Sequence, residues 1–189
     1  VPFTLGFIIP LLFIVSNIIA NFYSYDFNHL FELFKNSIYV GLISSFIIVV
    51  IAFYILNVKR LLDNKFISSI IKVLTTGYAV PGAVIGLSLM LLIRFFGDSY
   101  SFLMGTILLL IYAYVFRFIS VAIFPLETRL KRQPKTYDDQ AFSLWLNPLK
   151  LFYKITLPLN KKALLSAFIL VFIDIIKELP VTLILRPFN

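Results

Sequence analysis

Residues 37–56 read SIYVGLISSFIIVVIAFYIL, a run of 20 residues without a charged side chain. A helix of that length, at ~1.5 Å per residue, crosses the ~30 Å hydrocarbon core of a bilayer. The run is continuously apolar instead of alternating between apolar and polar residues, which argues against a strand of a membrane β-barrel. The stretch therefore predicts a membrane-spanning α-helix.

Similar apolar blocks recur along the whole chain. Of its 189 residues 60% are hydrophobic, and the mean hydropathy is +0.96, whereas soluble domains are about 45–50% apolar. The blocks predict five spans, over about Phe3–Ala20, Ser37–Leu56, Val73–Ile93, Phe102–Pro125 and Ala163–Leu185. We expect an all-α fold, a polytopic transmembrane helical bundle, with residues 1–189 forming one transmembrane domain.

The basic residues indicate the orientation of this bundle. Twelve of the 17 Lys and Arg residues lie in two segments, residues 57–72 and residues 127–162, which connect spans two and three and spans four and five. Such an excess of Lys and Arg is typical of cytoplasmic loops. The same bias explains the net charge of +8, so we expect a lipid membrane and no nucleic acid as a partner.

The sequence contains no pattern for catalysis or for a bound cofactor. It has no cysteine, His29 is its only histidine, and no glycine precedes a lysine. Thiolate metal sites, a Ser–His pair and a phosphate-binding P-loop are therefore excluded. We expect no metal site and no cofactor, and we do not expect an enzyme; any ATP hydrolysis that accompanies its function takes place on another chain.

Four charged residues interrupt the apolar spans. Arg117 lies in the fourth span, and Asp174, Lys177 and Glu178 lie in the fifth. Each costs ~2.5–3.5 kcal/mol on insertion scales, so charges within spans are paired or functional. From their similar depths we expect Arg117 to pair with Asp174, or with Glu178 one turn further out. The pair either tethers two helices or lines a polar translocation path.

Proline interrupts two of the spans. Pro81-Gly82 lies within the third span, and Pro180 lies within the fifth. Proline removes a backbone hydrogen bond, and broken helices at membrane depth are tolerated where they face protein or a water-filled cavity. Interrupted spans often mark the solute path of transporters. We therefore assign Pro81, Gly82 and Pro180 to a candidate path together with the charged cluster.

The long basic segment, residues 127–162, has an amphipathic pattern of its own. Between Tyr137 and Tyr153 the apolar and aromatic residues fit two short helices that meet at Asn147-Pro148. Proline is favoured at the first position of a helix, which places the bend there. Short amphipathic helices of this kind lie on a membrane surface or dock into a groove of a partner.

This segment resembles the EAA loop of ABC importer permeases. That loop has an acidic residue, two alanines, a glycine four residues after the second alanine, and a terminal Ile-x-Leu-Pro. The residues that carry the resemblance are Asp139, Gln140, Ala141, Trp145, Ile155, Leu157 and Pro158. Gln140 replaces an alanine and Trp145 replaces the glycine. The second change matters more, because tryptophan does not adopt a positive φ cheaply.

Three other segments are similar to ferric-iron ABC permeases: residues 77–87, residues 114–122 and the tail, residues 171–189. The resemblance implies a type I importer fold and the C-terminal half of a two-repeat permease. In that family one more span would follow Asn189, and we expect this chain to be a fragment that lacks it.

The resemblance also implies partners and a location. Two cytoplasmic ABC ATPase subunits would dock on the loops, a periplasmic or extracellular solute-binding protein would deliver the solute, and the other permease half would complete the path in the bacterial plasma (inner) membrane. Ferric iron is the preferred solute; thiamine, phosphonate, sulfate and polyamine are alternatives. An ion-coupled secondary transporter or channel that uses Arg117, Asp174 and Glu178 as a relay, or a non-transporting membrane scaffold, also remains open.

Overall fold

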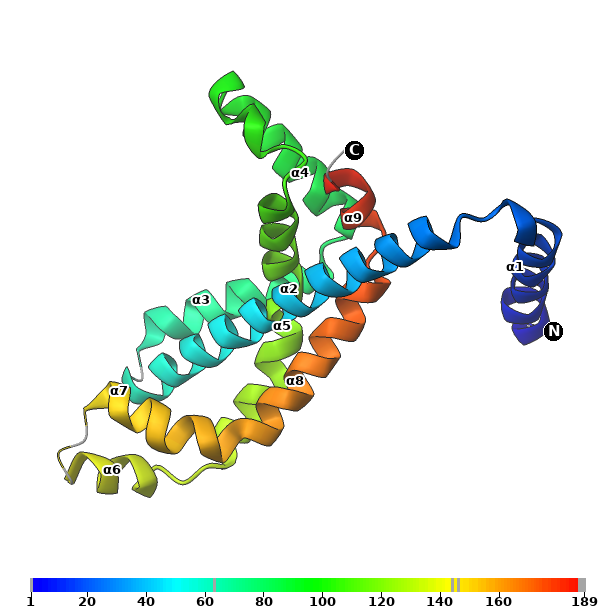
Figure 1. Ribbon diagram of the computed structural model, residues 1–189. Helices are drawn as coiled ribbons and strands as arrows, with labels where there is room; N and C mark the ends of the chain where they lie inside the picture. The colour runs from blue at the N-terminus through cyan, green and yellow to red at the C-terminus, as the bar shows by residue number, and fades with distance from the viewer. Residues whose placement is uncertain (1, 63, 144, 146, 187–189) are drawn as a thin grey trace. The chain divides into compact units, whose positions relative to one another are not determined.

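The computed structural model describes residues 2–62, 64–143, 145 and 147–186. Figure 1 shows that the described segments are helices and short connections. Contacts divide the chain into two compact units, Val1–Ser37 and Ile38–Asn189, and each unit is considered by itself below. The fold confirms the all-helical membrane protein that the apolar blocks predict.

The first unit is built from apolar helical turns. It contains the π-helix η1 (Thr4–Ile8), the helix α1 (Ile9–Ala20), the 3-10 turn η2 (Phe22–Ser24) and the start of α2 (Phe27–Leu62). The apolar side chains of α1 are exposed. A helix that is hydrophobic all round is suited to lipid or to a fully apolar interior.

The second unit begins within α2, whose 36 residues extend the predicted second span at both ends. One side of α2 is buried in the core through Ile48, Ala52 and Phe53, whereas Phe46 and Tyr54 are exposed. Both sides are apolar, as expected for a helix that contacts protein on one face and lipid on the other. Helix α2 ends at Leu62, within the first basic segment, residues 57–72.

The third predicted span is sharply bent. It consists of α3 (Lys65–Thr76), the 3-10 turn η3 (Gly77–Ala79) and α4 (Gly82–Phe95), and the chain bends by 111° between the two arms. The break at Pro81-Gly82 is therefore as predicted, but the segment starts earlier than predicted and is strongly bent, as Figure 1 shows. Two residues lie between η3 and α4, and their backbone is extended at Val80.

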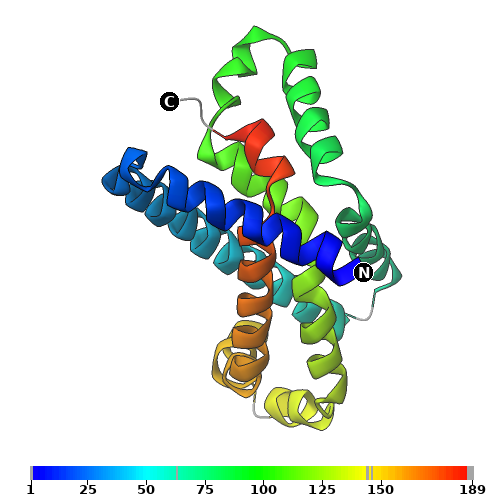
Figure 2. The ribbon, with the colours of Figure 1, turned by 90° about the vertical axis from the view of Figure 1, so that its right-hand side faces the viewer.

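The fourth predicted span is α5 (Ile107–Arg132), which follows the 3-10 segment η4 (Asp98–Leu103). Pro125 lies inside this helix without ending it. Helix α5 packs along α8 (Leu157–Lys177), and Figure 2 shows the two helices side by side. Their contact, together with the buried side of α2, forms the core; its largest fully buried side chains include Phe53, Phe118, Ile123, Leu126 and Val171.

The long basic segment is more helical than predicted. Helix α5 extends to Arg132, so α6 (Thr136–Ser143) is the first separate element of the loop. Helix α7 (Pro148–Leu151) begins at Pro148, and the Asn147 side chain accepts a hydrogen bond from the Lys150 amide, as expected for an N-cap.

The prediction of a second short helix was wrong. Helix α7 continues through the π-helix η5 (Phe152–Thr156) directly into α8, so residues 148–177 form one continuous helix. Figures 1 and 2 show that this helix is bent, because its first part and α8 run in different directions. Pro158 lies at the start of α8, directly after the π-helical turn and thus inside this continuous helix. A proline there removes a backbone hydrogen bond, which accounts for a bend at this place. The predicted boundary at Ala163 therefore falls inside a helix.

The fifth predicted span is interrupted as expected. Helix α8 ends at Lys177, Glu178 has an extended backbone, and α9 (Pro180–Leu185) begins with Pro180 at its first turn. Helix α9 packs against α4 (Figure 2). An added Cβ on Gly86 would lie 3.0 Å from Ile184, so the two helices pack closely there.

Among the residues that the structure describes, two single helices can cross a membrane by length and composition: Phe27–Leu62 and Ile107–Arg132. The bent pair α3–α4 is a third span if its arms are counted together. The first predicted span is a shorter apolar helix, Thr4–Ala20. The fifth contains the charged residues discussed below.

Gly77 tests the packing at the bend. A Cβ added to Gly77 would lie 2.3 Å from the Phe116 carbonyl oxygen on α5, and a backbone atom cannot move aside as a flexible side chain can. We expect Gly77→Ala to lower the free energy of unfolding by about 1–3 kcal/mol, measured by thermal unfolding in detergent. Gly6→Ala is the control, because its Cβ meets nothing within 4 Å. Equal stability of the two variants would contradict this packing.

Candidate functional site

Arg117 connects the two interrupted segments. Its Nε donates a hydrogen bond to Glu178 Oε2 at 2.9 Å, and its Nη1 donates to the carbonyl oxygen of Val80. Val80 directly precedes the break in the third segment, and Glu178 follows the end of α8. One side chain on α5 therefore bonds to both helix breaks. We call Arg117, Glu178 and Val80 the break cluster.

Glu178 uses both of its carboxylate oxygens. Oε2 accepts from Arg117, and Oε1 accepts from the backbone amide of Val181 at 3.3 Å, in the first turn of α9. A Cβ on Gly82 would lie only 2.1 Å from Oε1. Gly82 therefore leaves the space that this carboxylate occupies at the start of α4, a role that its position beside a proline does not reveal.

Tyr114 and Thr182 add a second bridge between α5 and α9. Their hydroxyl oxygens lie 2.6 Å apart, and Thr182 donates a hydrogen bond to the carbonyl oxygen of Glu178. The Arg117 guanidinium also lies 5.5 Å from the centre of the Phe118 ring. Sequence reasoning missed Tyr114 and Thr182, because a hydroxyl within an apolar span gives no signal of its partner.

The ion pair itself is well enclosed. The Arg117 and Glu178 side chains are 16% and 8% exposed. Of the two carboxylates considered for Arg117, the structure selects Glu178. Asp174 and Lys177 form no ion pair within the described part of the chain; Asp174 is half-buried and Lys177 is exposed. The four charges therefore do not form one cluster.

The break cluster is suited to holding backbone and charge in place, and no feature of it indicates catalysis. Buried ion pairs require hydrogen bonds for their remaining donors and acceptors, and Val80 and Val181 supply one on each side. Among the residues that the structure describes, no group of three His, Cys, Asp or Glu side chains could hold a metal ion.

The second candidate site is α6 and the turn that follows it. Asp139 and Gln140 are exposed on α6, whereas the side chain of Ala141 lies outside the described residues. Trp145 has a φ of +57° and its side chain is 96% exposed. The structure thus has a left-handed backbone at the position where the EAA pattern has glycine, and a tryptophan adopts it at a cost of roughly 1–2 kcal/mol.

The other residues of the EAA-like pattern lie in the continuous helix formed by residues 148–177. Ile155 belongs to η5, and Leu157 and Pro158 form the start of α8. Leu157 and Pro158 are exposed and Ile155 is half-buried. The pattern therefore consists of an exposed helix, an exposed turn and the base of a long helix.

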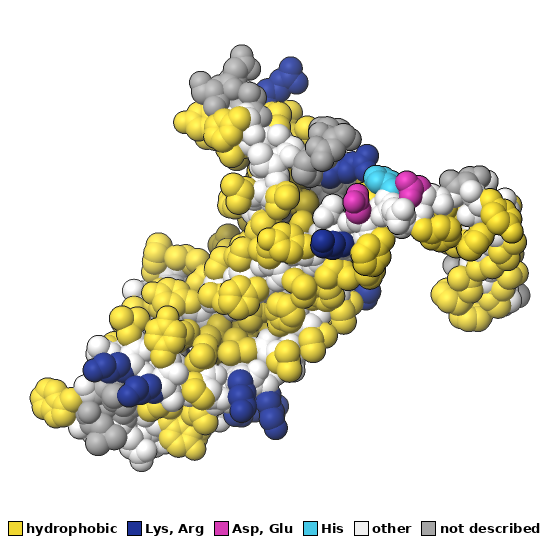
Figure 3. Space-filling view, viewed as in Figure 1, with side chains coloured by type: hydrophobic (Ala, Val, Ile, Leu, Met, Phe, Trp, Pro, Cys, Tyr) yellow, Lys and Arg dark blue, Asp and Glu magenta, His cyan; other side chains and the backbone are white. Residues whose placement is uncertain are grey.

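Arg60 attaches this loop to the end of α2. Its Nε donates to Asp138 Oδ2 at 2.7 Å, Nη1 donates to the Leu130 and Gln133 carbonyl oxygens, and Nη2 donates to that of Pro134. From the sequence, Arg60 is one more cation of a cytoplasmic loop. Its contacts confirm that the two basic segments lie at the same end of the second unit, where Lys and Arg side chains gather (Figure 3).

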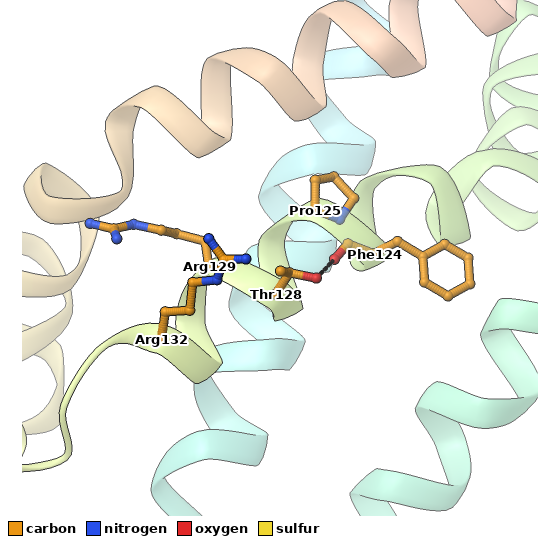
Figure 4. Close-up of a pocket in the computed structure, with 5 residues that line it drawn as sticks. All are labelled: Phe124, Pro125, Thr128, Arg129 and Arg132. Carbon is orange, nitrogen blue, oxygen red and sulfur yellow. Dashed lines mark hydrogen bonds between the residues drawn. The ribbon is translucent and has the colours of Figure 1, made fainter.

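A shallow hollow of about 460 Å³ lies beside the C-terminal part of α5. Figure 4 shows its lining residues, Phe124, Pro125, Thr128, Arg129 and Arg132, with the Thr128 hydroxyl bonded to the Phe124 carbonyl oxygen. All five come from one helix, and both arginines are exposed. Arg129 reaches towards the Leu159 carbonyl oxygen, 3.4 Å away, so the hollow is a surface feature of the α5–α8 pair.

Comparison with known proteins gives two similar permeases. The chain is 35% identical over 109 residues to the Fe(3+)-transport system permease protein FbpB 2 of Haemophilus influenzae, which covers 57% of this chain and 21% of that protein. It is 33% identical over 96 residues to the ferric transport system permease protein FbpB of Actinobacillus pleuropneumoniae, which covers 51% of this chain and 14% of that protein.

This chain is similar to ferric-iron transport permeases. Its matched part spans about a fifth or less of the length of either relative. No protein-family model matches the sequence. With the apolar helices, the permease relatives place the chain in the bacterial inner membrane as a multi-pass protein.

The break cluster predicts unequal effects for two charge removals. Arg117→Gln leaves the Glu178 carboxylate buried without its cation, so we expect a loss of about 3 kcal/mol or more in the free energy of unfolding. Asp174→Asn removes a charge that has no ion-pair partner among the described residues, and we expect a change within ~0.5 kcal/mol. Thermal unfolding in detergent compares them. An Asp174→Asn protein as unstable as Arg117→Gln would contradict the assignment of Glu178.

Proposed function

We propose that this chain is part of the permease subunit of an ATP-driven, binding-protein-dependent ABC importer for ferric iron. The observation that carries the proposal is the 35% and 33% identity to two ferric-transport permeases. The exposed EAA-like segment supports it, because a permease of this kind has no ATPase of its own and requires a docking surface. ATP hydrolysis is assigned to separate cytoplasmic subunits, and solute capture to a soluble binding protein outside the membrane.

We assign the solute path to the region of the two helix breaks. Breaks at membrane depth are tolerated next to protein or water. The hydrogen bonds of Arg117 to Val80 and Glu178 would hold the polar groups of the two broken helix ends in place. The other permease half would cover the remaining side of the path. Ferric ion prefers oxygen ligands, but the described residues offer no cluster to hold it, so recognition is assigned to the binding protein.

A continuous helix supplies a mechanical connection between motor and path. Residues 148–177 form one continuous, bent helix. Its first end follows the EAA-like turn, and its last residue precedes Glu178. An unbroken helix passes a displacement of one end on to the other. ATPase closure at α6 and α7 would therefore shift Glu178, and with it Arg117 and both breaks.

We assign the docking itself to α6 and Trp145, with Asp139 and Gln140 on the same exposed helix. A fully exposed tryptophan is costly in water and is enriched where interfaces are buried. The side chains of Arg60 and Asp138 are 9% and 10% exposed, and this buried ion pair would keep α6 in one orientation for docking. A pre-ordered docking helix loses less conformational entropy on binding.

Trp145 gives a test in which stability and binding change in opposite directions. Trp145→Gly relieves the positive φ, so we expect the free energy of unfolding to rise by about 1 kcal/mol. The same change removes the ring, so we expect binding of the ATPase subunit from the same genome to weaken at least about tenfold. Tyr153→Ala is the control, because Tyr153 is also an exposed aromatic residue but lies outside the turn.

Binding to the ATPase that Trp145→Gly leaves unchanged would remove Trp145 from the docking surface. Replacing Asp139 and Trp145 together by Arg tests the whole surface, and co-purification is expected to be lost. If the unaltered protein binds no ATPase either, the importer assignment is wrong.

Uptake by proteoliposomes tests the solute and the energy source. With the other permease half, the binding protein and the ATPase added, we expect radioactive ferric iron to enter only when ATP is supplied, and thiamine, phosphonate, sulfate and a polyamine not to enter. Collapsing the membrane potential and pH gradient with ionophores is expected to leave uptake unchanged. Uptake that follows the gradient without ATP would instead establish an ion-coupled transporter.

A further inference from the structure

A second cavity, of about 240 Å³, lies between the end of α2 and the end of α5. Its polar lining is Lys59, Arg60, Glu127, Lys131, Gln133 and Lys135. It is separate from the break cluster, and the EAA-like pattern includes none of its residues. We call it the basic cavity.

The charges of the basic cavity do not balance. Glu127 is shared by Lys59, at 2.8 Å, and Lys131, at 3.2 Å. Arg60 is paired with Asp138, which does not line the cavity. Even with Asp138 included, four cations face two carboxylates, and the Lys135 side chain has no ion-pair partner among the described residues. The cavity therefore attracts an anion.

Gln133 supplies a second indication of a ligand. The residue is 7% exposed, and its side-chain nitrogen is buried without a hydrogen-bond partner in the described part of the chain. Its side-chain oxygen already accepts from Asn160 Nδ2 at 3.0 Å. Oδ1 of Asn160 is likewise buried without a partner among the described residues. A buried donor left unpaired costs about 1–3 kcal/mol, and because Gln133 lines the cavity, a ligand oxygen that reaches its amide would remove that cost.

The position of the cavity indicates which anion it takes. Leu56 and Leu130 provide an apolar floor and are 2% and 5% exposed. Leu56 ends the apolar run 37–56, and Lys59 and Arg60 follow after Asn57 and Val58. The cavity thus lies where hydrocarbon gives way to headgroups, on the side with the excess of Lys and Arg.

We propose that the basic cavity binds the phosphate of an anionic phospholipid of the inner leaflet. Lys131 and Lys135 supply positive charge, and Gln133 Nε2 donates to a phosphate oxygen. The apolar floor contacts the glycerol and the first acyl carbons. Basic pockets between spans on the cytoplasmic side are suited to such headgroups. The proposal depends on the membrane location and not on the transport assignment.

The site also has a structural consequence. Arg60 and Gln133 both line the basic cavity and connect α2 to the loop: Arg60 of α2 bonds to Asp138 of α6 and to the carbonyl oxygen of Gln133. A lipid bound there would fasten α6 to the end of α2. Lipid composition would then influence how firmly the docking loop is held.

Native mass spectrometry of the purified protein, titrated with phosphatidylglycerol or phosphatidylcholine, tests the proposal. We expect one phosphatidylglycerol to bind in preference to phosphatidylcholine. Lys135→Gln should weaken it about fivefold, and Glu127→Gln, which frees Lys59 and Lys131, should strengthen it by a similar factor. Arg132→Gln is the matched control, because Arg132 is an exposed cation of α5 that lines the other hollow.

Three results would overturn the proposal. Equal weakening by Lys135→Gln and Arg132→Gln would indicate general surface charge and no built site. Millimolar inorganic phosphate could instead displace the lipid, and Lys135→Gln could weaken the binding of phosphate as much as that of lipid. Those two results together would indicate a site for free phosphate. Loss of lipid on addition of the ATPase, with Lys135→Gln weakening ATPase binding instead, would assign the cavity to an acidic group of that subunit.

Discussion

Two helical segments are interrupted, and one buried guanidinium bonds to both interruptions. A broken helix leaves backbone groups without intrahelical partners, and lipid cannot supply any. Arg117 satisfies the carbonyl oxygen of Val80, while Glu178 satisfies the amide of Val181 and neutralises Arg117. The sharp bend of α3–α4 and the separate helix α9 both depend on this arrangement, and Gly82 is required because the Glu178 carboxylate occupies the place of its Cβ.

The same arrangement connects the two helix breaks to the end of the second unit where the two basic segments lie. Helix α8 carries Glu178 just beyond its last residue, and its other end continues without a break into α7, next to the turn at Trp145. Arg60 bonds α6 to the end of α2. The first part of the loop is therefore fixed to α2, and its last part continues into the helix of residues 148–177. An importer needs such a connection, because the energy of ATP is released in the cytoplasm and is used in the membrane.

The helices and their breaks could be predicted from the sequence, because apolar length and the position of proline are local signals. The partner of Arg117 could be narrowed to two carboxylates by depth, but not to one, since α8 ends at Lys177 and the chain then turns. The start of the fifth helix was placed at Ala163, because the polar and basic residues before it give no apolar signal, whereas the helix begins at Pro148 and continues through Pro158. Arg60 gave no signal, because cytoplasmic cations are common.

The most direct test of the account is a double-mutant cycle between Arg117 and Glu178, measured by thermal unfolding in detergent. The variants are Arg117→Gln, Glu178→Gln and the two together. We predict a coupling free energy of about 1–3 kcal/mol, since contacting groups in one network are not additive. Additive losses, with a coupling energy near zero, would contradict the claim that this pair holds the two interrupted helices together.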